Sequence, residues 1–78
     1  KDDKQAVIWL RRAAEQEQDN AMCNLGWCYE RGHGVPQDWK QAVEWYRRAA
    51  QAGNTVAMGN LAGAMKREKV WKKTRQLR

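Results

Sequence analysis

The sequence predicts an all-α protein, a superhelix or solenoid of antiparallel helix pairs with about four helices. Two observations lead to this fold class. The chain repeats itself after 36 residues, and each period holds apolar residues at three- and four-residue steps. A single helix pair of this size cannot bury its apolar face alone, so successive pairs are expected to stack.

The repeat is clearest where QAVIWLRRAA at residues 5–14 falls on QAVEWYRRAA at residues 41–50. Further along the chain, residues 21–22 fall on the identical residues 57–58. Of the first 31 residues, 15 are identical to the residue 36 positions later, and this agreement sets the length of the unit.

The first predicted helix covers about residues 3–16. Asp2 and, three residues later, Gln5 form a capping-box pattern, in which side chains satisfy free backbone N–H groups of the first turn. Glu17 follows this helix, where the later copy has Gly53. Because glycine readily adopts the left-handed conformation of a helix C-terminus, the first helix is predicted to end less sharply than its copy.

The second predicted helix covers about residues 20–31 and is followed by a turn. Its apolar stripe contains Ala21, Met22, Leu25, Gly26 and Tyr29. The next six residues, GHGVPQ, include two glycines and a proline, which end the helix and reverse the chain. The glycine within the stripe is predicted to let an antiparallel neighbour approach closely.

The third predicted helix covers about residues 39–52 and copies the first. Asp38 and Gln41 give it the same capping-box pattern, and Gly53 follows its last turn. Its apolar stripe contains Ala42, Val43, Tyr46, Ala49 and Ala50.

These spacings carry a family resemblance. Residues 21–53 read A-x3-LG-x2-Y-x2-G-x-GV-x2-D-x3-A-x2-WY-x2-AA-x2-G, which resembles the Sel-1-like repeat, a relative of the tetratricopeptide repeat. By this resemblance, residues 1–17 are the second helix of a preceding repeat, 18–53 one full repeat and 54–65 the first helix of a following repeat. The resemblance implies a right-handed superhelix that binds partners on its concave side. Known members are adaptors and regulators in bacteria and in the eukaryotic secretory pathway.

Residues 66–78 form a basic tail in which the repeat pattern fails. Residues 1–65 hold eight basic and eight acidic side chains, so the net charge of +6 comes from the tail. Its basic residues are Lys66, Arg67, Lys69, Lys72, Lys73, Arg75 and Arg78. Without Gly or Pro beyond residue 63, the last helix is predicted to run on into it. A shifted reading frame with suitable synonymous codons restores the repeat, so we hypothesise a single-base insertion or deletion near codon 61.

No catalytic, metal or cofactor site is expected, and the chain is not predicted to be an enzyme. His33 is the single histidine, so it cannot form a two-His metal site, and it is predicted to be solvated in its Gly-rich loop. Cys23 and Cys28 lie about 140° apart on one helix and are predicted to be free thiols. Free thiols favour a reducing compartment such as the cytoplasm, whereas the resemblance also allows periplasm or secretion, so the localisation stays open.

The candidate partner-binding residues are Asn24, Trp27, Cys28 and Arg31. Trp27 lies about 100° from Gly26 around the helix, off the packed stripe, and an aromatic residue beside an arginine is typical of binding hot spots. In the family geometry these residues face the concave side; the alternative is that Trp27 and Cys28 pack against the first helix of the next repeat. The other tryptophans of the repeat units are predicted to pack within or between helix pairs: Trp9, Trp39 and Trp45.

Three functions stay open. The favoured one is a protein-interaction module or adaptor that binds another protein on its concave surface. The second is binding of a polyanion, either nucleic acid or anionic lipid, through the basic tail, which is disfavoured if the tail arose from a frameshift. The third is self-association through open repeat ends, because capping repeats are missing and the first helix would expose Val7, Ile8 or Leu10.

Overall fold

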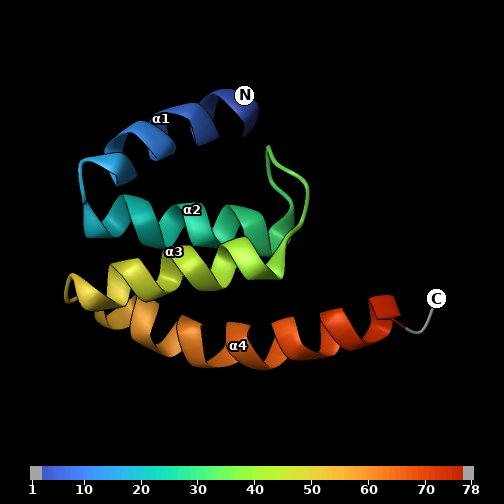
Figure 1. Ribbon diagram of the computed structural model, residues 1–78. Helices are drawn as coiled ribbons and strands as arrows, with labels where there is room; N and C mark the ends of the chain where they lie inside the picture. The colour runs from blue at the N-terminus through green and yellow to red at the C-terminus, as the bar shows by residue number, and fades with distance from the viewer. Residues whose placement is uncertain (1–2, 77–78) are drawn as a thin grey trace.

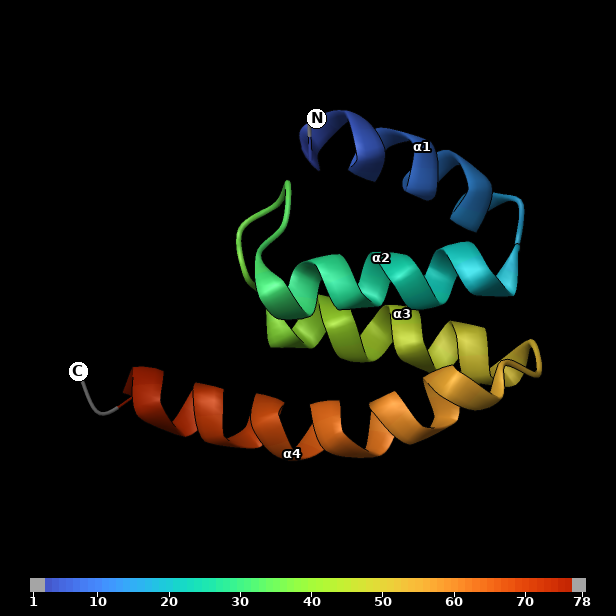
Figure 2. The same cartoon turned by 180° about the vertical axis from the view of Figure 1, so that it is seen from behind.

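The computed structural model describes residues 3–76, with side chains to residue 74, and this range contains four helices and no strand. The helices are α1 (Asp3–Glu15), α2 (Asp19–Arg31), α3 (Trp39–Gln51) and α4 (Thr55–Gln76). Each runs antiparallel to the one before it, and they stack in chain order from α1 to α4 (Figures 1 and 2). The predicted all-α arrangement of antiparallel helix pairs is confirmed.

The core is densest where α2 and α3 meet. Tyr46 and Leu25 are the largest fully buried side chains. The Tyr46 ring lies against Gly26, where an added Cβ would be 2.9 Å from two ring carbons. The Tyr46 hydroxyl donates a hydrogen bond to Glu30 Oε1 at 2.7 Å. Position 26 therefore needs glycine because a ring, not merely a helix, packs against its Cα.

The ends of α1 and α3 share one backbone structure although their sequences differ. Gly53 has a φ of 98°, and Glu17, in the equivalent place, has a φ of 62°. In both turns the next amide donates to the carbonyl five residues earlier, at 3.2 Å after Glu17 and 3.0 Å after Gly53. The prediction that the first helix ends less sharply is wrong, because the hydrogen bonds of a Schellman motif hold Glu17 in the left-handed conformation.

Side chains cap the helices unevenly. At the start of α3, Asp38 Oδ1 accepts hydrogen bonds from the amides of Lys40 at 3.0 Å and Gln41 at 3.3 Å, so its predicted capping role is confirmed. At α2, the preceding residue Gln18 makes no side-chain capping bond. Asp2, the predicted cap of the first helix, lies outside the described residues.

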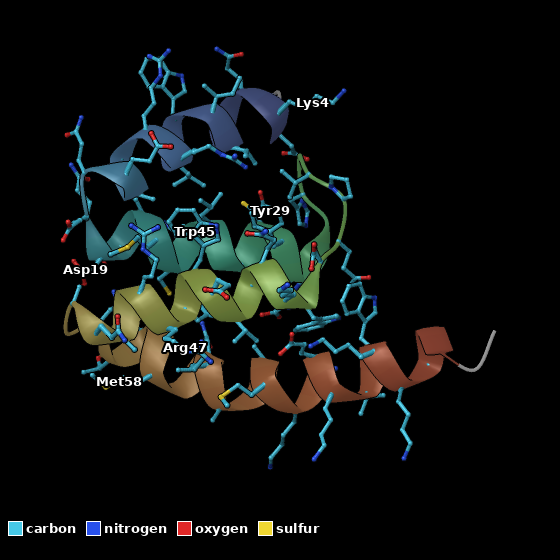
Figure 3. The ribbon with its side chains drawn as sticks, viewed as in Figure 1. Lys4, Asp19, Tyr29, Trp45, Arg47 and Met58 are labelled. Carbon is cyan, nitrogen blue, oxygen red and sulfur yellow. The ribbon has the colours of Figure 1, made fainter. Side chains whose placement is uncertain are left out.

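Asn54 joins consecutive units of the stack and is 8% exposed. Its Oδ1 accepts from the amide of Ala57 at 2.8 Å, which caps α4. Its Nδ2 donates to Asp19 Oδ2 at 2.9 Å and Asn20 Oδ1 at 3.0 Å. Figure 3 shows Asp19 at the start of α2, beside the turn between α3 and α4. One side chain therefore caps α4 and fixes it against α2.

Helix α1 is less covered than its copy α3. The sequence predicted that α1 exposes Val7, Ile8 or Leu10: Ile8 is 47% exposed, whereas Val7 is 5% exposed, close to the 4% of Val43. Trp9 is 60% exposed although it was predicted to be packed, and the Arg12 guanidinium lies 5.3 Å from its ring centre. Trp45, in the same place on α3, packs partly buried against the core. The difference arises because α2 covers one side of α3, and no described helix covers that side of α1.

Candidate partner-binding groove

An open groove lies between α1 and α2, near the loop that joins α2 to α3. It is lined by Asp3, Ala6, Leu10, Asn24, Trp27, Cys28 and His33. Ala6 and Leu10 come from α1, whereas Asn24 and Trp27 come from the exposed side of α2. The groove thus brings together three of the four predicted binding residues with α1 residues that the sequence interpretation did not include.

Trp27 stands at the rim of the groove and is held by two neighbours. Its ring stacks on His33, with ring centres 4.8 Å apart and an interplanar angle of 13°. The Arg31 guanidinium lies 5.6 Å from its ring centre. Trp27 itself stays 42% exposed. The ring is an oriented apolar surface, and Arg31 supports it instead of lining the groove.

His33 is exposed in its Gly-rich loop, as predicted, and it also contacts α1. Its Nδ1 lies 3.6 Å from Asp3 Oδ2 in the first turn of α1, and its side chain is 47% exposed. The loop between α2 and α3 extends towards the start of α1 in both views (Figures 1 and 2). Helical periodicity could not predict this contact, because it depends on the conformation of the loop.

Cys28 forms the floor of the groove. It is 7% exposed, so a bound molecule would reach its sulfur only at the bottom. Burial raises the pKa of this thiol, and the carboxylate of Asp3 raises it further. The thiol is therefore protonated near neutral pH and acts as a small apolar side chain.

The groove occupies a repeated place in the fold. Three of its lining residues have counterparts 36 residues later that another helix of the chain already covers. The three are Ala6, Leu10 and Asn24, and their counterparts are Ala42, Tyr46 and Asn60. On α1, Ala6 is exposed and Leu10 is half-buried. On α3, their counterparts Ala42 and Tyr46 are fully buried.

The element that fills the later copy is α2. A Cβ added at Gly26 of α2 would lie 2.9 Å from the Tyr46 ring and 3.2 Å from the Ala42 carbonyl oxygen. Asn60 Nδ2 lies 4.0 Å from Cys23 Sγ, also on α2. The groove between α1 and α2 therefore has the position and the lining that, one unit later, hold a helix.

In a comparison with protein families, the Sel1 repeat model matches residues 1–17 and 19–54. The chain belongs to the Sel1 repeat family. The resemblance seen in the sequence is confirmed, and the matched segments contain α1 and the α2–α3 pair. Sel1 repeats generally act as protein-interaction modules, and the family is not a catalytic one. The comparison with curated proteins found no match.

Two buried thiols and one buried tyrosine hydroxyl are expected to make the stability of this Sel1 repeat depend on pH. Burial raises the pKa of Cys23 and Cys28 above the usual 9.0, and burial with the hydrogen bond to Glu30 raises the pKa of Tyr46 above the usual 10.0. Unfolding lets these groups ionise at their usual pKa. Their contribution to the free energy of unfolding is therefore fully present below about pH 9. It is lost as the pH rises towards the pKa values that these groups have in the folded chain. We expect the free energy of unfolding, from urea titrations, to fall above pH 9; a constant or rising value would contradict this.

The predicted polyanion-binding residues follow the Sel1 match, along the second half of α4. Five are exposed: Lys66, Arg67, Lys69, Lys72 and Lys73. Arg75 lies within α4, and Arg78 lies outside the described residues. The Arg67 guanidinium is 5.9 Å from the ring centre of Trp39, which lines a second open groove with Trp71. Within residues 3–76, no group of His, Cys, Asp and Glu side chains could hold a metal ion, and no helix has the length and apolarity to cross a membrane.

Proposed function

We propose that this Sel1 repeat chain is a protein-binding module whose groove between α1 and α2 receives an amphipathic helix of a partner protein. The observation that carries the proposal is that this groove is equivalent to the surface of α3 and α4 on which α2 lies. Helix-in-groove recognition needs an apolar trough with polar groups at its rim. Ala6 and Leu10 supply the trough, and Asn24 supplies a polar group beside it.

Trp27 is the residue expected to contribute most to the affinity. Its stack on His33 and its contact with Arg31 limit its motion before binding, so little side-chain entropy is lost on association. Tryptophan is enriched among the few residues that dominate interface energies. Its exposed edge lies beside the trough, where a bound helix would cover it.

The filled copy indicates which helix would fit. There, Gly26 of α2 lies against the ring of Tyr46. In the groove, Leu10 takes the place of Tyr46 and is shorter, so an alanine as well as a glycine has room opposite it. The partner helix is therefore expected to place a small residue against Leu10. Larger apolar residues would lie three or four positions away, as Met22 and Tyr29 flank Gly26.

Polyanion binding through the second half of α4 is the rival function. A net charge of +6 and a row of exposed lysines attract polyanions at low salt. Such binding weakens steeply as salt rises, whereas burial of apolar surface in the groove does not. A salt titration therefore separates the two functions.

Trp27→Ala is expected to weaken partner binding about tenfold or more, because it removes the exposed aromatic surface beside the groove. Partners are trapped with the photo-crosslinking residue p-benzoylphenylalanine at position 24, with and without Trp27→Ala. The matched control places the same residue at Glu44, an exposed position on α3. Circular dichroism checks that helix content is unchanged. Equal trapping from positions 24 and 44, or trapping unaffected by Trp27→Ala, would remove the groove from the binding site.

A further inference from the structure

Helix α4 carries an apolar stripe that no described helix covers. Met58 and Met65 are each 48% exposed, and Ala62 between them is exposed. The stripe corresponds, 36 residues earlier, to Met22, Gly26 and Tyr29 of α2. Figure 3 shows Met58 near the start of α4.

On α2, two of these equivalent positions, Met22 and Gly26, form the contact with α3, whereas the Tyr29 hydroxyl accepts a hydrogen bond from Arg11 of α1. Gly26 lies against the Tyr46 ring, and Met22 is 2% exposed. The stripe on α4 is therefore one half of a helix-pair interface that this chain already makes once.

Helix α1 presents the other half of the same interface. Ala6, Leu10 and Ala13 correspond to Ala42, Tyr46 and Ala49, each of which is 0% exposed on α3. On α1 the same places are exposed or half-buried. One molecule thus shows both complementary faces of an α2–α3 contact, on opposite sides of its stack.

We propose that α4 of one copy of this chain lies in the groove of a second copy and pairs with its α1 as α2 pairs with α3. This rests on the proposed function, because it names the helix that the groove receives. The pairing continues an interface already present within the chain, and its side chains match in size. Ala62 would face Leu10 where Gly26 faces Tyr46, so the extra methyl group on one side meets a shorter side chain on the other.

This pairing joins two different faces, so it is head-to-tail. Each copy added leaves one free α1 face and one free α4 face at the ends of the assembly. The copies then continue the helix stack in the way that successive repeats of one chain do. The assembly is expected to grow beyond a dimer. Added salt is not expected to weaken the assembly. Its interface is apolar, and salt screens the repulsion between copies that each carry a net charge of +6.

Sedimentation equilibrium of the 78-residue chain over a range of concentrations tests the proposal. Met58→Glu/Met65→Glu puts two charges on the α4 stripe. The matched control, Val56→Glu/Val70→Glu, puts the same charges on side chains 64% and 65% exposed that lie off the stripe. All four side chains are at least 48% exposed, so neither variant is expected to lose helix content, which circular dichroism checks.

The mean mass of the unmodified chain and of the control is expected to rise with concentration beyond twice the 9.1 kDa of one copy. The stripe variant is expected to stay at 9.1 kDa. A single-copy mass of the unmodified chain at every concentration would overturn the proposal. So would a plateau at two copies, or equal association of the two variants.

A directional cross-link gives an independent readout. Ala6→Cys and Ala62→Cys, made as separate proteins, are mixed and oxidised. Head-to-tail pairing predicts a disulfide between the two different variants, in excess of any dimer that either forms alone. No excess in the mixture would contradict the pairing. The stripe variant keeps its groove, so continued trapping of another protein from position 24 would leave the proposed function standing if self-association fails.

Discussion

Tyr46→Ala is expected to remove a large part of the chain's free energy of unfolding. The side chain is fully buried, lies against Gly26 and donates to Glu30, so its removal leaves a cavity in the contact between α2 and α3. Truncating a large buried aromatic residue costs about 3–5 kcal/mol. A chain of this length is expected to have a total stability of about 4–12 kcal/mol. Loss of the circular dichroism signal and a lowered urea midpoint would measure the effect.

Tyr46→Phe is the matched control for this substitution. It keeps the ring and removes only the hydroxyl, so a loss of about 1 kcal/mol is expected. The Glu30 side chain is 24% exposed and can bind water when the hydroxyl is gone. If alanine and phenylalanine had the same effect at position 46, the ring would not be the centre of the core.

Asn54→Ala is expected to lower the free energy of unfolding by about 2–4 kcal/mol. The substitution removes the cap of α4 and both hydrogen bonds to the start of α2, one of them to the carboxylate of Asp19. Because Asn54 is 8% exposed, water cannot readily replace these bonds. Urea titration of the variant measures the loss.

Asn60→Ala is the control for Asn54→Ala. Asn60 also lies on α4 and is half-buried, but its amide reaches only the sulfur of Cys23, at 4.0 Å. A loss below about 1 kcal/mol is expected, because a sulfur accepts hydrogen bonds weakly. Equal losses at positions 54 and 60 would show that Asn54 does not link the units.

Much of the fold could be predicted because the sequence repeats itself after 36 residues. The apolar steps place α2 and α3, and the 36-residue offset then assigns α1 and the first half of α4 by comparison. The end of α1 could not be predicted this way. Glu17 is a poor residue for a left-handed position by local preference, but the backbone hydrogen bonds of the turn outweigh a cost of about 1–2 kcal/mol.

The candidate site could be predicted only in part. Trp27 followed from its angle around one helix, and Asn24 followed from the geometry that the family resemblance implies. The α1 side of the groove was missed because its apolar residues were expected to be packed or to mark an open end. The signal was nevertheless present: Leu10 occupies the place of Tyr46, and a core position without its neighbouring helix is a candidate binding surface. The contact of His33 with Trp27 had no signal, because it depends on a loop.

The most direct test of the account is whether the groove between α1 and α2 holds a helix equivalent to α2. A peptide of residues 19–31 is titrated into the ¹⁵N-labelled chain carrying Met58→Glu/Met65→Glu, which is expected to be monomeric. The account predicts amide shifts at Ala6, Leu10 and Asn24. Their counterparts Ala42, Tyr46 and Asn60 should stay unchanged, because α2 already fills their site. No shifts at the first three positions, or equal shifts at both sets, would contradict it.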